Sequence, residues 1–566
     1  MAHYKKVLRT ARWEYIVPAL AIASLIISCI LISSKKFFWN DELFSYYFLA
    51  DPSFTHMLGA FHDKLNNTPP LYFLLGWLWT RVFGSTELSL RLFSSLGMCI
   101  ACAITWITLR RTYNFWSTSI GVLSVFCTSN LILSQNAEAR MYGLFLVLCA
   151  LGLFQYDLIN RSSRFTWKLL LSNSCIHAAI VNTHLFGLFY STAIAFALIV
   201  RDIYFKTFRS KVYLSIFLSW FSIILYLPSF INQADAGNPR SWVPLPTLKD
   251  LADVLSFSLL TFQEINILSF LKLTILLLIG LVSAWQLFLY KNGKYSSKTN
   301  EDLPDNEAEI SLFIFAYSFF TIPVLIWIIS YTVKPIFWDR YMIPSVLSWS
   351  ILFASLSSLL IFDSNFFNQI FEKLGASRFS AAQQKTVFLV GLSAILLVQP
   401  IVYATNASSY GTSVVIQERP GLDDNKYGYT DLPIAVPYSQ DFLERFHYSP
   451  ERDRYFFILD WPVALDASSG LFSTQQYKHM EAWKRNYPNW FKNHIIKGEE
   501  FLGRYKQFLI LTKPDYTRKC TIEKTLNNIY CPRWIEMRIM SNPTYKVTSL
   551  GDVDNKRLLV VETRNE

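Results

Sequence analysis

Long apolar runs separated by short charged segments constrain this chain more than any other feature of its sequence. The first run extends from about Trp13 to Ser34, and a helix needs roughly 20 apolar residues to cross the hydrocarbon core of a bilayer. Charged residues make up only 16% of the chain, well below the roughly 25% of an ordinary globular protein. The sequence therefore predicts an all-α polytopic membrane domain with about eleven transmembrane helices.

The cations between these runs set the predicted orientation. Lys5, Lys6 and Arg9 precede the first run, which favours a retained first helix whose amino terminus is cytoplasmic. Later segments rich in lysine and arginine then fall on the same side, and the segments that carry most carboxylates fall on the other side. The predicted spans lie near residues 13–34, 87–109, 115–134, 141–158, 168–183, 185–200, 213–230, 265–290, 310–331, 341–362 and 386–405.

A shorter apolar segment decides which side each later loop occupies. Pro69–Gly84 is apolar over only about 15 residues, fewer than the roughly 20 that a span requires. Counting it as a span would place Arg110 and Arg111 outside and invert every later loop. We therefore expect a helix that lies at the outer interface, with Arg110 and Arg111 inside.

The chain becomes polar after residue 405, and charged residues then occur at an ordinary frequency. β-rich runs at Tyr455–Leu459, Phe508–Thr512 and Leu558–Glu562 are separated by helical stretches such as Thr474–Asn486. We expect a transmembrane domain over residues 1–405 and a small soluble α/β domain on the outer face over residues 406–566.

The cysteines bear on a possible disulfide, and the net charge bears on the kind of partner that the chain binds. Cys520 and Cys531 fall in the predicted soluble domain, where an oxidising compartment would permit a disulfide between them. The net charge of +11 does not indicate nucleic acid, because the positive-inside rule explains where most of the excess cations lie. Membrane lipid is the expected surrounding partner, and no glycine-rich nucleotide-binding loop is present in the sequence.

Four groups of polar residues occur where apolar runs are predicted to reach the outer face. Asp41 and Glu42 are costly in contact with lipid, so they must face water or a protein cavity. Each group alone is consistent with a solvated loop or with interfacial charges, but four groups from separate spans predict a shared polar cavity. The groups are Trp39-Asn40-Asp41-Glu42, Glu138-Ala139-Arg140-Met141-Tyr142, Thr183-His184 and Trp338-Asp339-Arg340-Tyr341.

Five short motifs, in this order and spacing, carry a family resemblance over roughly residues 10–200, with a looser match at Arg340-Tyr341-x-x-Pro344. The motifs are Trp39-x-Asp41-Glu42, Pro69-Pro70-Leu71-Tyr72, Phe83-Gly84-x-x-Glu87-Leu88-Ser89-Leu90-Arg91, Glu138-Ala139-Arg140-Met141-Tyr142 and Thr183-His184-x-Phe186-Gly187. Together they resemble the bacterial branch of the protein O-mannosyltransferase family. That branch belongs to the GT-C glycosyltransferase superfamily and includes the lipid A aminoarabinose transferases.

The resemblance implies a fold, a reaction and roles for particular residues. It implies a GT-C transmembrane catalytic domain that is capped by a soluble domain. The catalytic acidic residue of the first outer loop falls on Asp41, with Glu42 beside it. Arg140 and Arg340 are expected to bind the donor phosphate, because a guanidinium group can hold phosphate oxygens in a bidentate way. The residues expected to line the substrate cavity are Trp39, Tyr72, Glu138, Tyr142, His184 and Tyr341.

The implied activity is transfer of a hexose or pentose from a polyprenyl-phosphate-linked donor to a lipid, glycan or protein acceptor. A carboxylate would accept the proton of the acceptor hydroxyl as that oxygen attacks the anomeric carbon, which predicts inversion. The implied location is the inner membrane of a bacterium, with the carboxy-terminal domain periplasmic or extracellular.

Two other hypotheses and one metal site stay open at this point. A transporter or flippase of lipid-linked glycans should show two related halves with broken helices, whereas this chain has one acidic loop and a large polar tail. A scaffold without activity would not need Asp41, Glu42 and Arg140. A divalent metal could be held by His184 with Asp41 or Glu138, although a single histidine at such a place is more often a hydrogen-bonding group.

Overall fold

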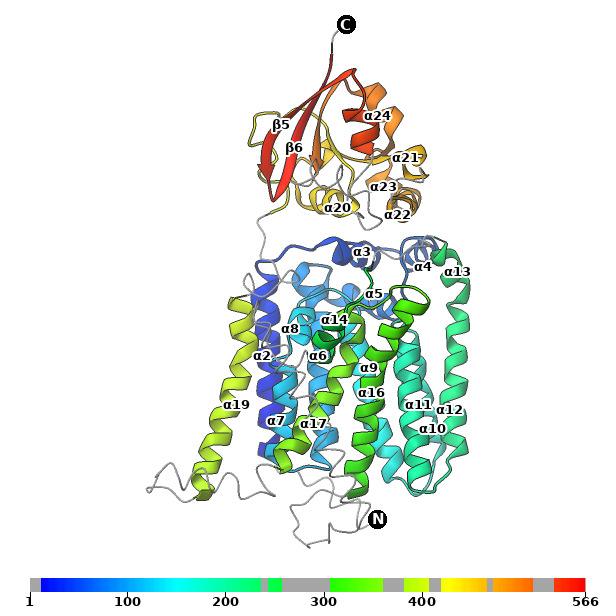
Figure 1. The fold of residues 1–566 in the computed structure, drawn as a ribbon, viewed down its shortest axis with the longest axis vertical. Helices are drawn as coiled ribbons and strands as arrows, with labels where there is room; N and C mark the ends of the chain where they lie inside the picture. Colours follow the sequence, from blue (N-terminus) through cyan, green and yellow to red (C-terminus); the bar gives the residue numbers. More distant parts are fainter. Residues whose placement is uncertain are drawn as a thin grey trace.

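A computed structural model describes residues 12–235, 243–256, 306–359, 381–406, 419–465, 472–512 and 534–564. Figure 1 shows a layer of roughly parallel helices, with a smaller region that contains a β-sheet stacked on one end of it. We call the first part the helical layer and the second, residues 419–564, the C-terminal region. The end of the helical layer that faces the C-terminal region is the cavity end.

The helical layer contains the membrane-crossing segments. Seven helices in the described ranges are long and apolar enough to span a membrane, or up to nine if each of two bent pairs forms one span. The chain is therefore a multi-pass membrane protein. The seven are α2 (Ile16–Ser33, preceded by η1, Arg12–Tyr15), α6 (Glu87–Arg110), α9 (Tyr142–Arg161), α11 (Gly187–Tyr204), α16 (Asn306–Thr332), η3 with α17 (Asp339–Ser345 and Val346–Ser358) and α19 (Ala381–Thr405).

The two bent pairs have local causes in the sequence. Helices α7 (Phe115–Phe126) and α8 (Asn130–Asn136) meet at 65°, and Ser129 begins α8 by accepting a hydrogen bond from the backbone of Ile132. The second pair joins α12 (Ser210–Trp220) and η2 (Phe221–Leu225) to α13 (Leu227–Ala234) at 55°. Helix α13 has a proline in its first turn, which lacks the N–H needed to continue the preceding helix.

The count of seven to nine candidate spans in the described ranges is lower than the predicted count of about eleven. The span predicted at 265–290 lies outside the described residues. The span predicted at 168–183 is helix α10 (Trp167–Val181), whose 15 residues rise only about 22 Å. The span predicted at 115–134 is the bent pair of α7 and α8.

Helix α6 runs from one end of the helical layer to the other. At its first turns, Arg91 forms an ion pair with Glu42 at 2.8 Å. At its other end, Arg110 forms an ion pair with Glu14, also at 2.8 Å. From Arg91 to Arg110 the helix rises about 28 Å, so the first turn of α3, which carries Asp41 and Glu42, is separated from η1 by nearly the roughly 30 Å thickness of a hydrocarbon core.

Short helices cover the cavity end of the layer. They are α3 (Asn40–Leu49), α4 (Phe54–His62) and α5 (Leu71–Phe83). A further short helix, α14 (Leu248–Leu255), packs against α16. Helix α5 is the segment predicted to lie at the interface, and its 13 residues rise about 20 Å, too little to cross the roughly 30 Å hydrocarbon core. It is held at the cavity end because Leu71 donates its N–H to the carbonyl of Asn182 and Thr80 bonds the carbonyl of Leu49 at 2.7 Å.

The C-terminal region is built on a mixed six-stranded sheet with the order β3-β2-β1-β4-β6-β5. The predicted β-runs and the predicted helix at 474–486 are all present. Cys520 and Cys531 lie outside the described residues. The strands are β1 (Ile434–Val436), β2 (Tyr455–Leu459), β3 (Ile495–Lys497), β4 (Gln507–Thr512), β5 (Tyr545–Val553) and β6 (Lys556–Thr563), and the helices are α20 (Ser439–Tyr448), α21 (Trp461–Leu465), α22 (Phe472–Asn486), α23 (Pro488–Phe491) and α24 (Gly498–Arg504).

Helices α20 and α22 dock the C-terminal region onto the cavity end. The Tyr448 hydroxyl accepts the backbone N–H of Phe38 at 2.7 Å and lies 2.9 Å from the carboxylate of Glu87. The fully buried Trp483 packs against aromatic side chains of α3 with ring centroids 5.3 to 5.5 Å apart. Burial of such large aromatic surfaces stabilises an interface, so the C-terminal region is packed firmly against α3 and covers it.

Candidate active site

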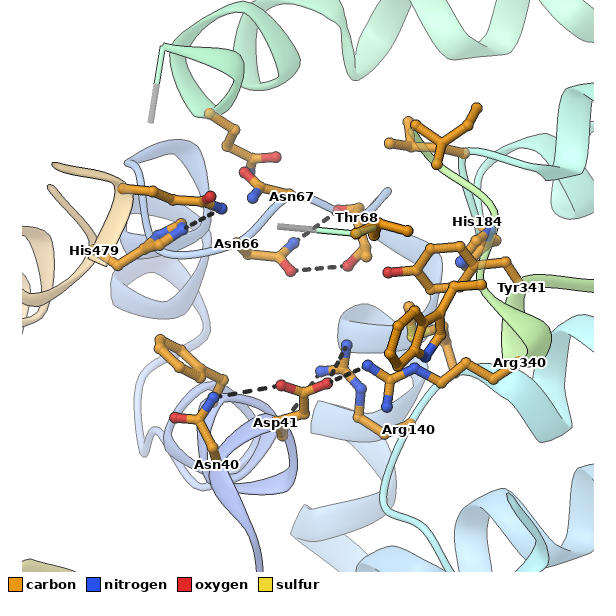
Figure 2. A pocket seen from close by; sticks show the side chains of 18 of the residues that line it. Asn40, Asp41, Asn66, Asn67, Thr68, Arg140, His184, Arg340, Tyr341 and His479 are labelled. Atoms are coloured by element: carbon orange, nitrogen blue, oxygen red, sulfur yellow. Dashed lines mark hydrogen bonds and ion pairs between the residues drawn. The ribbon is translucent and has the colours of Figure 1, made fainter. Parts of the chain in front are cut away.

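A cavity of about 690 Å³ lies between the helical layer and the C-terminal region, within the size range of small-molecule sites. Side chains from both parts line it, as Figure 2 shows in part. The lining residues come from the start of α3 and Phe44, residues 65–68, Arg140 and Met141, residues 184–186, α13, Val243, the segment 334–341, α20 and α22.

Asp41 and two arginines from distant segments form the charged centre of this cavity. Arg340 donates a hydrogen bond to Oδ2 of Asp41 at 2.8 Å, and a terminal nitrogen of Arg140 lies 3.9 Å from the same oxygen. Arg140 also donates to the backbone carbonyl of Asp41 at 3.0 Å and to the hydroxyl of Ser45 at 3.2 Å. The three side chains remain 13 to 22% exposed, so a bound molecule can reach them.

The guanidinium group of Arg340 is held between aromatic rings. It lies 5.3 Å from the ring centroid of Trp39 and 5.8 Å from that of Tyr142. Such contacts attract a cation to the electron-rich face of a ring. They hold Arg340 above Asp41 without consuming its hydrogen-bond donors, which leaves donors for an anion.

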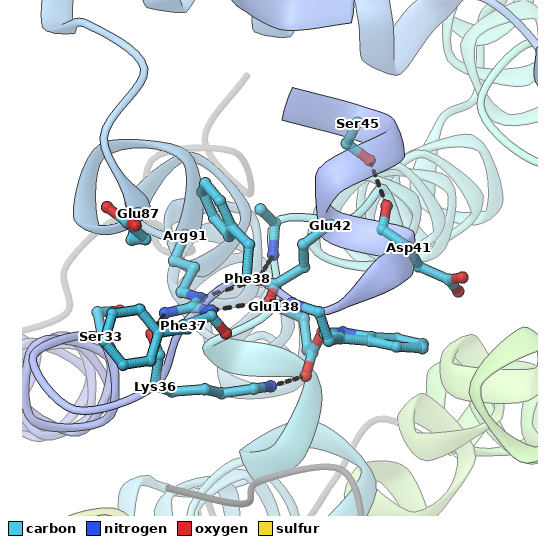
Figure 3. Close-up of polar contacts among 12 residues, drawn as sticks. Ser33, Lys36, Phe37, Phe38, Asp41, Glu42, Ser45, Glu87, Arg91 and Glu138 are labelled. Atoms are coloured by element: carbon cyan, nitrogen blue, oxygen red, sulfur yellow. Dashed lines mark hydrogen bonds and ion pairs between the residues drawn. The ribbon is translucent and has the colours of Figure 1, made fainter. Parts of the chain in front are cut away.

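The neighbouring carboxylates Asp41 and Glu42 have different surroundings, although both lie in the first turn of α3. Glu42 is fully buried and accepts two hydrogen bonds of 2.8 Å from Arg91 and one of 2.8 Å from the backbone of Ala139 (Figure 3). Burial alone would raise the pKa of Glu42, but Arg91 and Lys36 outweigh burial and lower it. Glu42 is not among the residues that line the cavity, which argues against the catalytic role predicted for it.

Glu138 is also turned away from the cavity. It is buried, forms an ion pair with Lys36 and accepts a hydrogen bond of 2.5 Å from the indole N–H of Trp39 (Figure 3). Burial raises its pKa, even though Lys36 acts in the opposite sense. Glu138 therefore touches the cavity only through Trp39, whose ring lines it.

His184 and Tyr341 line the cavity beside Arg340. The Nδ1 atom of His184 accepts the backbone N–H of Phe186 at 3.1 Å, so the proton of the neutral ring lies on Nε2. Burial, together with Arg140 and Arg340, lowers the pKa of His184 to about 3. His184 is thus a neutral hydrogen-bond donor at any physiological pH.

The two other predicted cavity residues, Tyr72 and Tyr142, are buried and are not among the lining residues. Tyr142 still contributes by supporting Arg340. Of the residues considered for a metal, Glu138 is bonded to Lys36 and Trp39 and does not line the cavity, whereas Asp41 and His184 both line it. No group of three His, Cys, Asp or Glu side chains suited to a metal occurs within the described ranges.

Several lining residues were not predicted from the sequence. Asn66, Asn67, Thr68 and Lys334 line the cavity, but the sequence gave none of them a role in the site. Their types are common in loops, so composition gave no signal. The C-terminal region contributes Ser439, Gln440, Gln475, Gln476 and His479. These residues lie about 400 to 440 positions after Asp41 in the sequence and reach the site through the docking of α20 and α22.

Comparisons with known proteins agree with this architecture at the level of the fold. No family model matches the chain, and no curated protein matches it by sequence. The crystal structure of ArnT from Cupriavidus metallidurans bound to undecaprenyl phosphate superposes with a TM-score of 0.51 at 10% identity, over 97% of this chain and 98% of that one.

Two further solved structures show weaker similarity. ArnT of the same organism in the apo state has a TM-score of 0.49 at 11% identity, with 97% of each chain covered. The archaeal oligosaccharyltransferase AglB from Archaeoglobus fulgidus, in complex with an inhibitory peptide and a dolichol-phosphate, has a TM-score of 0.45 at 11% identity, over 92% of this chain and 72% of that one. The end-to-end match to the undecaprenyl-phosphate-bound ArnT shows that this chain has the GT-C fold, a polytopic helical layer with a small α/β C-terminal region.

Proposed function

We propose that this chain is a membrane glycosyltransferase that transfers a sugar from a polyprenyl-phosphate-linked donor to an acceptor in the cavity. The observation that carries the proposal is Asp41, which is exposed to the cavity and flanked by Arg140 and Arg340. One carboxylate beside two guanidinium groups provides a proton acceptor and an anion site within one small volume. The bound undecaprenyl phosphate of ArnT supports a donor of this class.

The leaving group accounts for the two arginines. When the bond between the anomeric carbon and the phosphate oxygen breaks, the lipid phosphate gains a negative charge. Arg140 and Arg340 can stabilise that charge, because guanidinium donors that are already positioned need little reorganisation. Lys334 also lines the cavity.

The attacking group accounts for Asp41. The acceptor hydroxyl oxygen forms the new bond to the anomeric carbon while its proton passes to Asp41. Oδ2 of Asp41 is bonded to Arg340 at 2.8 Å, whereas within the described ranges Oδ1 has only the amide of Asn40 at 3.4 Å. Oδ1 is therefore the atom that accepts the proton. A single displacement of this kind inverts the anomeric configuration.

The proposal also assigns roles to the two domains and to the buried ion pairs beside Asp41. Residues 1–405 form the catalytic transmembrane domain, and residues 406–566 form a domain that covers the site. Glu42 with Arg91 and Glu138 with Lys36 position the loop that carries Asp41 and Trp39. The protein lies in a bacterial inner membrane with its cavity end on the periplasmic side. The opposite end of the helical layer, which is rich in cations, lies on the cytoplasmic side.

Mass spectrometry of glycolipids and glycoproteins from cells with and without this gene tests the proposal. Loss of the protein should remove one glycosylated lipid, glycan or protein and should cause a polyprenyl-phosphate sugar to accumulate. Identical profiles in both strains, under conditions where the protein is made, would contradict a transferase function.

A further inference from the structure

Among the charged side chains that line the cavity, cations outnumber carboxylates. Arg140, Arg340 and Lys334 supply three positive charges, whereas Asp41 is the one carboxylate among the described lining residues. Asp41 already forms an ion pair with Arg340 at 2.8 Å. The nearby carboxylate of Glu42 is fully buried on Arg91, so the described cavity wall offers no further carboxylate to a bound cation.

Uncharged amide and hydroxyl groups form another part of the lining. We call Asn66, Asn67, Thr68, Gln475 and Gln476 the amide wall. In Figure 2, Asn66 and Thr68 lie across the open space from Asp41 and Arg140. Amide and hydroxyl groups both donate and accept hydrogen bonds, which suits the hydroxyl groups of a sugar.

Hydrogen bonds within the amide wall fix its side chains. Asn66 donates to the carbonyl of Thr68 at 2.7 Å and accepts from the Thr68 hydroxyl at 2.8 Å. Gln476 donates to the hydroxyl of Ser439 at 2.9 Å. These contacts engage the amide nitrogen of Gln476 and leave its carbonyl oxygen as an acceptor that can face the cavity.

His479 lies on the same side of the cavity as the amide wall and is uncharged. Its Nδ1 atom donates to the backbone carbonyl of Lys64 at 2.5 Å, and burial lowers its pKa. Its Nε2 atom therefore accepts from the amide of Gln475, 3.5 Å away. The side of the cavity opposite the arginines is thus polar and neutral.

We infer that the sugar brought to this cavity carries no cationic substituent and is bound through its hydroxyl groups by the amide wall. This inference rests on the proposed function and narrows its substrate class. An ammonium group on the sugar would lose its hydration beside Arg140 and Arg340, and Asp41, the one carboxylate among the described lining residues, is already paired with Arg340. A hydroxyl or an acetamido group would instead match the amide wall.

Equilibrium binding to the purified full-length protein tests the inference without knowledge of the acceptor. The probes are a short-chain polyprenyl phosphate, the same lipid phosphate carrying an uncharged hexose, its 2-amino analogue and its 2-acetamido analogue. At pH 7 we expect the 2-amino analogue to bind about tenfold or more weakly than the hexose. The acetamido analogue restores neutrality at the same carbon, so it should bind more tightly than the free amine.

The outcomes separate the two claims. If the polyprenyl phosphate and all three sugar derivatives fail to bind, the proposed donor class is wrong and the inference falls with it. If the lipid phosphate binds but the free amine binds as tightly as the uncharged hexose, the donor class survives and the inference is overturned.

A substitution in the amide wall provides an independent check. Gln476→Glu places a carboxylate on the neutral wall with little change of shape, so it should strengthen binding of the 2-amino analogue relative to the hexose. Gln507→Glu is the matched control, because Gln507 is exposed on β4 and does not line the cavity. An unchanged preference in Gln476→Glu would contradict the role of the amide wall.

Discussion

Arg340 donates a 2.8 Å hydrogen bond to Asp41 across 299 residues of sequence. This contact joins the loop after the first transmembrane helix to the beginning of the η3–α17 span, and it places a carboxylate and a guanidinium group on one cavity surface. The arrangement serves two needs of glycosyl transfer, because the proton acceptor lies next to the group that stabilises the departing phosphate.

Arg340→Ala should weaken use of the lipid-phosphate donor more than use of the acceptor. Loss of a bidentate phosphate donor removes a charge-assisted contact, and we expect the donor KM to rise about tenfold or more. Steady-state kinetics with each substrate varied in turn would measure this. Arg81→Ala is a matched control, because Arg81 lies on α5 and does not line the cavity. A donor KM that is the same in both variants would exclude a phosphate contact by Arg340.

Glu42→Gln should destabilise the protein, whereas Asp41→Asn should not. Glu42 and Arg91 are both fully buried, and removing one member of such a pair typically costs about 3–5 kcal/mol. Asp41 is 22% exposed to the cavity, so its neutral amide remains accommodated. Thermal unfolding of the two variants in detergent would measure the difference. Equal stability of both variants would mean that Glu42 is not a structural residue.

Glu444 should make the C-terminal region less stable as the pH rises. Burial, reinforced by Asp441, raises the pKa of Glu444 to about 7, compared with roughly 4.3 in an unfolded chain. Between these values the folded state retains a proton that the unfolded state has lost, so this stabilisation is complete below about pH 4.3 and disappears by about pH 7. Melting of the full chain at pH 5 and pH 7.5 should show a smaller pH effect in Glu444→Gln than in the wild type.

Cysteine labelling tests the orientation. Thr55 and Ser163 are exposed, and they lie at opposite ends of the helical layer, on α4 and after α9 respectively. An impermeant thiol reagent added to intact cells should label Thr55→Cys and not Ser163→Cys, with the parent protein showing the background. The reverse pattern would invert the topology.

The sequence predicted most of the described spans, the interfacial helix and the placement of Asp41 at the cavity end, because lipid permits few ways to arrange apolar runs and charges. It could not separate Asp41 from Glu42. Successive residues of a helix point about 100° apart, so only the packing of α3 determines which carboxylate faces the cavity. The amide wall was also missed, because Asn66 and Gln475 are ordinary surface residue types that tertiary docking brings together.

The most direct test of the central claim is transfer by an Asp41→Asn variant in cells that lack the native gene. Asp552→Asn is the matched control, because Asp552 lies on β5 in a local ion pair with Arg557. Mass spectrometry of glycolipids and glycoproteins should show that Asp41→Asn cells match cells without the gene, at equal levels of membrane-inserted protein, while Asp552→Asn cells match the wild type. A wild-type profile in Asp41→Asn cells would contradict the catalytic role of Asp41.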